Sequence, residues 1–253
     1  MARVMLTGAS SGLGAAMARR FAERGDHLLL VARRRPLLEE LQAELLGEGA
    51  SHVEHRVVDL AHESQVQQLV NDLPELGVDV LINNAACGHW DYSWDTTPER
   101  MRYMIAVNVS AVAVLSVAFS QINHLKPARL MNVASGAGYA LFEGSIPYSA
   151  SKFFVTALTE GIARELSSQK HAMRSQLLAP GPMATEFGAS AMDGSKMDRT
   201  DASGVQFHTA AEVAEFAMQL FDSDATVGAV QPDMSFALSG GRHPVGQLLD
   251  AAW

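Results

Sequence analysis

The sequence predicts an α/β protein with a doubly wound Rossmann fold, in which about seven parallel strands are flanked by helices. Three observations predict it. Short apolar runs alternate with helical patterns from the first residue to about residue 230. A glycine-rich turn follows the first apolar run. The chain has 253 residues, of which 48% are hydrophobic, enough to bury one large core. Strand–helix alternation of this kind is typical of a parallel sheet covered by helices on both faces.

The predicted strands are short runs that end in polar or turn residues. They cover residues 3–7, 27–32, 52–58, 78–82, 129–133, 174–178 and 227–230. The last run could continue past Pro232, and a proline is best tolerated there on an edge strand.

The predicted helices are the segments whose apolar residues recur at helical spacing. They cover residues 15–24, 36–46, 63–73, 98–124, 148–167 and 210–221. Thr96 or Thr97 is the predicted cap of the long fourth helix. Residues 106–119 of that helix are apolar nearly all round, which predicts burial on more than one side.

The composition argues against several classes of protein. The 19 Lys and Arg residues against 28 Asp and Glu residues give a formal charge of −9, which argues against a nucleic-acid partner because such a partner needs a basic face. The single cysteine, Cys87, excludes an internal disulfide and any site with several thiolates. No uninterrupted apolar stretch of 18 residues and no signal-peptide pattern is found. We therefore expect no membrane association and a cytoplasmic location.

The chain is expected to form one domain, residues 1–253. Residues 188–203 hold Gly, Ser, Asp and Met without clear periodicity. This composition predicts a loop or lid rather than a domain boundary, within a substrate loop of about residues 183–208.

The glycine-rich turn has a spacing that suits a dinucleotide. Gly8 would allow the tight turn, Gly12 would let the backbone approach a pyrophosphate, and Gly14 would let the helix pack closely on the strand. The start of the following helix would offer free N–H groups and a positive dipole end to the anion. The alternative is an ordinary structural turn, but the position between a strand and a helix favours the dinucleotide.

The end of the second strand predicts which dinucleotide is bound. An acidic residue there would hold the ribose 2′-hydroxyl of NAD, but this chain has Ala32 followed by Arg33, Arg34 and Arg35. Guanidinium groups bind phosphate in a bidentate manner, so we expect NADP(H), with Arg33 as the first candidate and Arg34 as the second. The alternative is a solvated cluster at a helix start, where cations are slightly unfavourable.

A tyrosine and a lysine share one helix face. Tyr148 and Lys152 are four residues apart, so their side chains are neighbours on a helix. A nearby ammonium would favour the phenolate and lower the pKa of Tyr148 from its usual value of about 10. Such pairs also occur by chance on helix surfaces. Ser135, however, directly follows a predicted strand, at the edge where open α/β sheets place ligands.

Together these motifs resemble the classical short-chain dehydrogenase/reductase family over essentially the whole chain. Thr7 to Gly14 is similar to the family's TGxxxGxG turn, and Asp59-Leu60 to its adenine-contacting segment. Asn83-Asn84-Ala85 resembles its NNAG segment, with Ala86 in place of the glycine. Asn108, Ser135, Tyr148 and Lys152 fall on its Asn-Ser-Tyr-Lys tetrad. Pro180-Gly181 and Thr185 resemble the segment that meets the nicotinamide carboxamide.

The resemblance implies roles for these residues. Ser135 would bond the substrate carbonyl oxygen, Tyr148 would donate a proton to it, and Lys152 would hold the ribose hydroxyls. Asn108 would keep a water that links Lys152 to solvent. The implied cofactor contacts are Gly8, Ser10, Ser11, Gly12, Leu13, Gly14, Arg33, Arg34, Asp59, Leu60, Asn84, Ala85, Ala86, Tyr148, Lys152, Pro180, Gly181 and Thr185.

Apolar and aromatic residues near these motifs predict a hydrophobic or aromatic carbonyl substrate. The candidate substrate contacts are Trp90, Trp94, Phe142, Ser145, Met183 and Phe187. For Trp90 and Trp94, covering the core beneath a loop is an equally good interpretation. The histidines show no convergent ligand set, so no metal is expected.

The predicted function is interconversion of a carbonyl compound and a primary or secondary alcohol with NADP(H). A non-catalytic NADP(H) sensor or scaffold, and an epimerase or dehydratase of the same fold, remain as alternatives. The helices after Pro98 and from Tyr148 resemble those of the family's four-helix subunit contact, which implies a homotetramer or homodimer.

Overall fold

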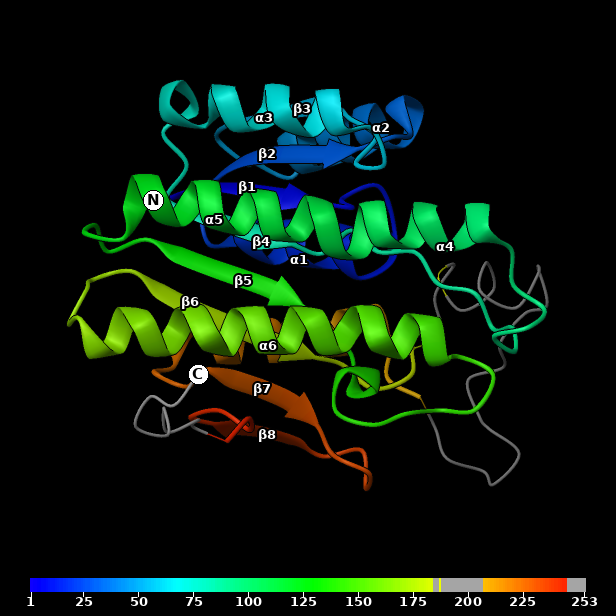
Figure 1. Ribbon diagram of the computed structural model, residues 1–253. Coiled ribbons are helices and arrows are strands. Elements are labelled where there is room, and N and C mark those ends of the chain that lie inside the picture. Colours follow the sequence, from blue (N-terminus) through cyan, green and yellow to red (C-terminus); the bar gives the residue numbers. More distant parts are fainter. Residues whose placement is uncertain (184–186, 188–206, 245–253) are drawn as a thin grey trace.

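A computed structural model describes residues 1–183, 187 and 207–244 of the chain. Within this part, eight strands form one sheet in the order β3-β2-β1-β4-β5-β6-β7-β8 (Figure 1). The strands from β3 to β7 are parallel, and β8 runs antiparallel to β7. The predicted doubly wound α/β fold in a single domain is therefore confirmed.

The bounds of the elements follow the chain order. The strands are β1 (Arg3–Thr7), β2 (His27–Ala32), β3 (Val53–Val57), β4 (Val80–Asn83), β5 (Arg129–Val133), β6 (Arg174–Ala179), β7 (Val227–Val230) and β8 (Phe236–Ser239). The helices are α1 (Gly12–Glu23), α2 (Arg35–Gly47), α3 (Glu63–Leu76), α4 (Pro98–Ile105), η1 (Ala106–Ala111), α5 (Val112–Asn123), η2 (Gly136–Gly138), α6 (Ile146–Ser168) and α8 (Ala210–Asp222).

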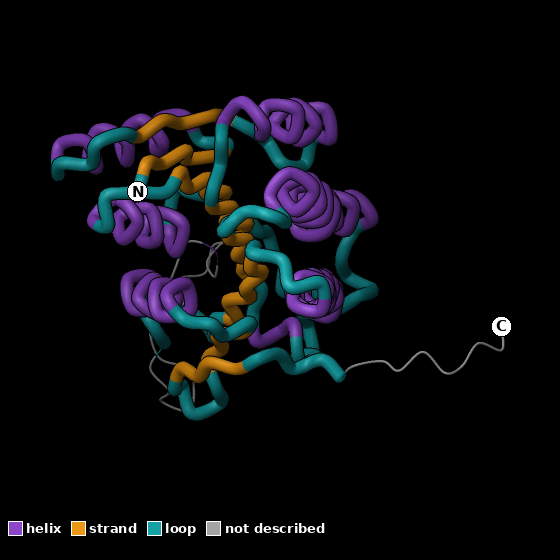
Figure 2. The backbone as a smooth tube through the Cα atoms, turned by 90° about the vertical axis from the view of Figure 1, so that its left-hand side faces the viewer, coloured by secondary structure: helices purple, strands orange, loops and turns teal. Residues whose placement is uncertain are grey.

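The sheet lies between two helical layers, as the side view in Figure 2 shows. Side chains alternate between the two faces of a strand, and β1 shows this directly. Val4 and Leu6 belong to the core formed with α1, α2 and α8, whereas Met5 belongs to the core formed with α3, α5 and α6. Both faces are covered, which is why the parallel strands read as nearly continuous apolar runs.

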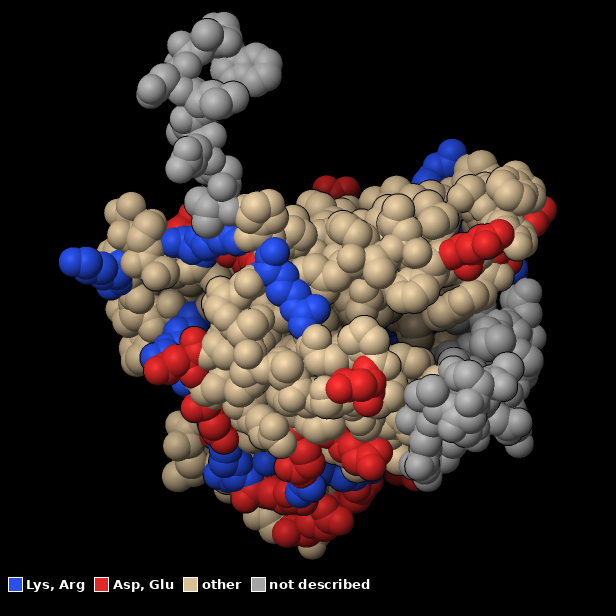
Figure 3. All heavy atoms as spheres, turned by 90° about the horizontal axis from the view of Figure 1, so that it is seen from below, with Lys and Arg blue, Asp and Glu red and all other residues tan. Residues whose placement is uncertain are grey.

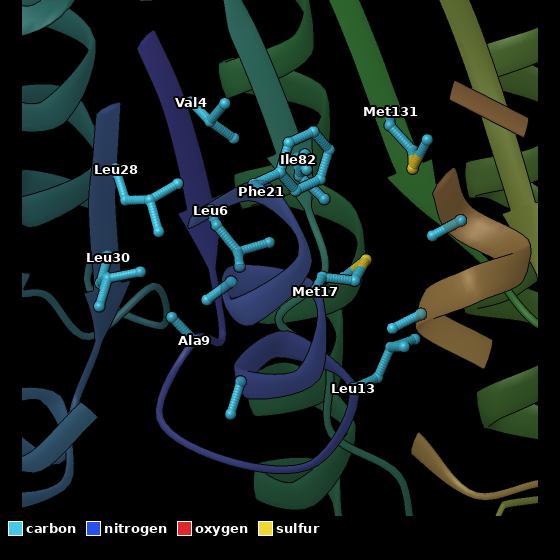
Figure 4. Packing of buried hydrophobic residues seen from close by; sticks show 14 of the residues in the cluster. Val4, Leu6, Ala9, Leu13, Met17, Phe21, Leu28, Leu30, Ile82 and Met131 are labelled. Carbon is cyan, nitrogen blue, oxygen red and sulfur yellow. The ribbon is translucent and has the colours of Figure 1, made fainter. Parts of the chain in front are cut away.

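Helix α1 packs its apolar stripe onto the centre of the sheet. Met17 and Phe21 are fully buried, and Figure 4 shows them beside Leu6 of β1 and Ile82 of β4. Their four-residue spacing places both on one helix face. This packing fixes the start of α1 at the end of β1, where the glycine-rich turn lies.

Several element ends differ from the sequence-based expectation by one to three residues, and two differences are informative. Helix α1 begins at Gly12 rather than at residue 15, because Gly12 and Gly14 already lie in its first turn. The last strand does not continue past Pro232. It ends at Val230, and the chain returns as the antiparallel strand β8 after a turn closed by the bond from Gln231 N to Ser235 O (2.8 Å).

The predicted long helix is continuous and consists of α4, η1 and α5. Thr97 caps it, accepting a hydrogen bond from Arg100 N at 3.2 Å, and a π-helical segment, η1, separates α4 from α5. By length and hydropathy alone, Pro98–Asn123 could span a membrane. In this fold one face of the helix packs on the sheet, where Leu115 and Phe119 are fully buried, while other apolar residues such as Val114 and Val117 stay exposed.

The predicted substrate loop lies almost entirely outside the described residues. Residues 188–203 and Thr185 fall there, as does the end of the chain from residue 245. Met183 and His208, which flank the loop, form an isolated parallel bridge, so the two ends of the loop lie side by side.

Candidate active site

One cavity of about 1070 Å³ opens at the carboxyl ends of β1, β4, β5 and β6. The sheet changes winding direction between β1 and β4, and open α/β sheets bind ligands at this switch point. The cavity brings together all the predicted cofactor residues of the described chain. They are Gly8, Ser10, Ser11, Gly12, Leu13, Gly14, Arg33, Arg34, Asp59, Leu60, Asn84, Ala85, Ala86, Tyr148, Lys152, Pro180 and Gly181.

The turn between β1 and α1 has room only for glycine at two positions. Gly8 has φ of +68°, and a Cβ there would lie 2.8 Å from Ala85 Cα. A Cβ on Gly14 would lie 2.1 Å from Gly8 O. The predicted tight turn at Gly8 is present. Gly14 lets the helix approach the turn itself, rather than the strand that the glycine spacing suggested.

Thr7 and Asn84 fasten the turn to the end of β4. The Thr7 hydroxyl accepts hydrogen bonds from Asn84 N (3.0 Å) and Ala85 N (3.1 Å). Asn84 Nδ2 donates to Thr7 O (3.0 Å) and Gly8 O (3.3 Å). The side chain of Asn84 therefore shapes the floor of the cavity by holding the glycine-rich turn.

The start of α1 offers an anion site at this floor. Ser11 occupies the cap position, but its side chain makes no cap bond to the helix. The first turn of α1, with its N–H groups and positive dipole end, lines the cavity. Arg34 donates to Ser10 Oγ at 3.2 Å and also bonds Ser11 Oγ. A guanidinium beside a helix start is suited to bind phosphate. The cradle fits the pyrophosphate of a dinucleotide.

Arg33, which follows β2 and lines the cavity, contacts an aromatic ring. Its guanidinium bonds the Tyr103 hydroxyl and lies 5.7 Å from the ring centroid. Tyr103 lines the cavity as well. No local pattern in the sequence predicts this contact, because Tyr103 is 70 residues away on α4 and only the fold brings it to the end of β2.

Tyr148, Lys152 and Ser135 meet at the inner end of the cavity. Tyr148 and Lys152 lie on α6, with 6% and 2% of their surfaces exposed. Lys152 Nζ donates to Val133 O at 3.0 Å and lies 5.7 Å from the Tyr148 ring centroid. The Ser135 side chain lies near enough to Tyr148 to favour ionisation of its phenol. The turn after β5 therefore brings the predicted serine to the predicted tyrosine.

The sequence-based expectation that the pKa of Tyr148 is lowered is wrong. Burial raises the pKa of Tyr148 well above its usual value, and the neighbouring Ser135 side chain opposes this rise only in part. Burial also lowers the pKa of Lys152 to about 8. Desolvation exceeds the charge effect because both groups lie inside the protein. Tyr148 is consequently a neutral phenol, which is the form that can donate a proton.

Asn108 lies behind the cavity rather than in its lining. It is fully buried in η1. Both N–H donors of its amide are used, one by Cys87 O (2.8 Å) and one by Ser151 Oγ (3.1 Å), and its Oδ1 accepts from Cys87 N (2.9 Å). The side chain thus pins the loop after β4 onto the π-helical segment.

The outer end of the cavity is mainly apolar. Of the predicted substrate contacts, the cavity is lined by Trp90, Phe142, Ser145, Met183 and Phe187. Trp90 and Phe187 pack on the Tyr148 ring, with centroid distances of 6.1 and 5.7 Å. Trp94 does not reach the cavity. It is 78% exposed and stacks on Tyr92, outside the lining.

Two polar residues of this outer end were not anticipated. Glu143 lines the cavity and accepts a hydrogen bond from the Tyr92 hydroxyl at 3.3 Å. His89 also lines it, and its buried Nδ1 has no hydrogen-bond partner among the described residues. No sequence motif marks either residue. Within the described part of the chain, no cluster of three or more His, Cys, Asp or Glu side chains could hold a metal ion.

Comparison with known proteins places this site in a family. Residues 2–196 match the family described as short chain dehydrogenase. A similar protein is the dehydrogenase/reductase SDR family member 11 of Gallus gallus, which is 33% identical over 192 residues, covering 72% of this chain and 75% of that protein.

Two solved structures show the same architecture. A short-chain dehydrogenase from Sphingobium yanoikuyae in complex with NADPH superposes with a TM-score of 0.81 and 30% identity, covering 90% of this chain and 87% of that one. A short chain dehydrogenase/reductase from Burkholderia phymatum in complex with NAD gives 0.76 and 26%, covering 87% and 85%. Since the family match covers most of the chain and agrees with the fold, this protein belongs to the short-chain dehydrogenase/reductase family of oxidoreductases.

Proposed function

We propose that this protein is an NADP(H)-dependent oxidoreductase that interconverts a hydrophobic or aromatic carbonyl compound and its alcohol. The observation that carries the proposal is the continuity of the cavity. It joins a phosphate cradle at the start of α1 to the buried Tyr148, Lys152 and Ser135. A sensor or scaffold would not need a buried phenol beside a buried lysine and a serine in the cavity that binds the nucleotide.

Three residues, Ser135, Tyr148 and Lys152, would have separate roles in the reaction. A bound nicotinamide dinucleotide would supply or accept the hydride. Ser135 would donate a hydrogen bond to the carbonyl oxygen and stabilise the negative charge that develops there. Tyr148 would give its proton to the same oxygen as general acid. Lys152, with a single acceptor at Val133 O among the described residues, would use its remaining N–H donors on the ribose.

Cofactor preference follows from the end of β2, next to the α1 cradle. Ala32 ends β2 without a carboxylate, and Arg33 and Arg34 line the cavity beside it. Two guanidinium groups would hold the 2′-phosphate of NADP(H). Structural neighbours are known with NADPH and with NAD, and these arginines favour NADPH here.

Substrate chemistry follows from the outer end of the cavity. Trp90 and Phe187 pack on the Tyr148 ring, and Phe142 lines the same cavity. Such surfaces bind apolar or aromatic groups. We also propose a homo-oligomer, with a cytoplasmic location as the sequence predicts.

The proposed chemistry is tested by Tyr148→Phe. This variant lacks only the hydroxyl, so NADPH-coupled reduction of aromatic ketones and aldehydes should fall at least about 100-fold, while NADPH affinity measured by fluorescence titration should persist. Tyr92→Phe, which alters a tyrosine outside the cavity lining, serves as the control. Full activity of Tyr148→Phe would reject the mechanism, and product formation without net cofactor change would indicate an epimerase or dehydratase.

The cofactor preference is tested by Arg33→Ala. Loss of a charge-assisted hydrogen bond should weaken NADPH binding about tenfold or more and leave NADH binding nearly unchanged. Arg35→Ala is the matched control, because Arg35 does not line this cavity and pairs with Glu39 at 3.7 Å. Equal losses for NADPH and NADH would contradict a 2′-phosphate role.

A further inference from the structure

The turn that carries Ser135 is fastened to α6 at two places. Gly138 N donates to Ser135 O at 2.9 Å. The Thr156 hydroxyl lies 3.2 Å from Gly138 O and 2.9 Å from Phe153 O, so these two carbonyls share its one hydrogen. A Cβ on Gly138 would lie 2.6 Å from Thr156 Cγ2, so the contact is close. The next residue, Tyr139, donates its hydroxyl hydrogen to Glu160 Oε1.

The segment after β8 binds the same two residues of α6. Glu160 Oε2 accepts hydrogen bonds from Arg242 N at 2.7 Å and His243 N at 2.9 Å. The ring of His243 lies with Nε2 3.0 Å from Thr156 Oγ1. Residues 138–139 and residues 242–243, which are far apart in the sequence, therefore meet on one carboxylate and one hydroxyl.

Glu160 is a buried charge that depends on these partners. Only 1% of its surface is exposed, and an isolated buried carboxylate is strongly unfavourable. Burial acts to raise the pKa of Glu160, but the hydrogen bonds from Tyr139 and from the backbone of His243 and Arg242 outweigh it and hold the pKa below its usual value. Arg164 stands 3.9 Å away. If either the Tyr139 hydroxyl or the backbone N–H groups of residues 242–243 were lost, the carboxylate of Glu160 would be less well fixed for the remaining donors.

Gly241 makes the close approach possible. Its φ is +133°, a conformation that favours glycine, and a Cβ there would lie 3.0 Å from Glu160 Oε2. A Cβ on the neighbouring Gly240 would meet nothing within 4 Å. The two glycines thus differ in whether a methyl group would disturb the carboxylate.

We infer that Glu160 is a positioning residue for catalysis, which locks residues 240–244 to the Ser135 turn, so that the seating of this C-terminal segment sets the position of Ser135. The inference rests on the proposed function. Glu160 and Tyr139 lie outside the cavity lining, and they act through the turn rather than on substrate.

The test compares two variants, one in each of the two segments that contact the Glu160 carboxylate. Tyr139→Phe removes the donor on the turn, and Gly241→Ala displaces the C-terminal segment. Each should lower kcat for a carbonyl substrate about three- to tenfold, with the Kd for NADPH unchanged within about twofold. Because both act through Glu160, the double variant should lose less than the product of the two effects. Gly240→Ala and Glu165→Gln, an exposed carboxylate on the same helix, should match the wild type.

Hydrogen exchange gives a readout that does not need turnover. Gly241→Ala should speed exchange at the amides of Gly138 and Tyr139, which bond Ser135 O and Gly136 O, whereas Gly240→Ala should not. A lower melting temperature for Gly241→Ala with unchanged kcat and unchanged exchange would overturn the inference. If the wild type reduces no carbonyl, the proposed function fails, and the exchange result alone decides the role of Glu160.

Discussion

At the residue scale, the chemistry of this site depends on two ionisable groups that water barely reaches. Tyr148 and Lys152 are both nearly fully buried, and burial favours the neutral form of each. The phenol is therefore retained as an acid. Reduction of a carbonyl can use it directly, whereas oxidation of an alcohol first needs its deprotonation.

The buried ammonium also links stability to pH. Below pH 8, Lys152 is charged in the folded and unfolded states, so the full cost of its burial is present. Its pKa is about 8 in the folded protein, against 10.5 for a free lysine side chain. Between these values the folded protein releases the proton first, so the free energy of unfolding rises with pH across this window relative to a chain without the group.

Replacing Lys152 by methionine tests this linkage. At pH 7 the variant should raise the free energy of unfolding by about 1–3 kcal/mol, net of the lost bond to Val133 O. The gain should shrink between pH 8 and pH 10. Urea unfolding at both pH values measures it, with the exposed Lys126→Met as control. A variant less stable than the wild type at pH 7 would show that the hydrogen bond outweighs desolvation.

At the element scale, the join between β1 and α1 is closely packed. The helix, the turn and the end of β4 meet at Gly8, Gly14 and Asn84. Their contacts are made largely with backbone atoms, which leave no space for a methyl group. The nucleotide cradle is therefore built from packing constraints as much as from polar groups.

Gly14→Ala should disrupt this join. The added Cβ would overlap Gly8 O, so α1 or the turn must move, at a cost of about 1–3 kcal/mol in the free energy of unfolding. NADPH affinity should fall with it. Gly161→Ala in the middle of α6 is the control, because nothing lies within 4 Å of the position that its Cβ would take and alanine is the better helix former by about 1 kcal/mol. Denaturant midpoints and NADPH titrations of both variants provide the comparison.

At the scale of the whole molecule, the surface is partly apolar. The face in Figure 3 shows acidic and basic side chains scattered among wide areas without charge, and no continuous basic surface is visible on it. On α5, Val114 and Val117 are 42% and 46% exposed, and Phe154 on the neighbouring α6 is 37% exposed. Helices α5 and α6 lie in the same layer (Figure 1). An apolar stripe across two helices favours contact with another subunit.

Val117→Glu should therefore change the assembly. A charge placed in an apolar subunit contact is costly, so sedimentation should show the wild type as a dimer or tetramer and the variant shifted towards single chains. Leu46→Glu on α2 is a matched control, since Leu46 is 45% exposed in the opposite helical layer. A wild-type mass of one chain would reject the homo-oligomer.

Local patterns in the chain were enough to specify the layered fold and most of the cavity lining. Strand and helix periodicity are local properties, and the glycines near Gly8, the arginines after Ala32 and the pair Tyr148–Lys152 are local motifs. Each can be recognised within a few residues of chain. The predicted run 227–230 is strand β7, but the antiparallel strand β8 that follows it was not predicted.

The environment of those residues, by contrast, was set by the packing of the whole chain. Packing placed Tyr103 beside Arg33, kept Trp94 away from the cavity, and reversed the expected pKa shift of Tyr148. It also brought Tyr139 and the backbone of residues 242–243 to Glu160. Burial and contacts between distant segments depend on how the layers pack, and no local pattern in the chain encodes either quantity.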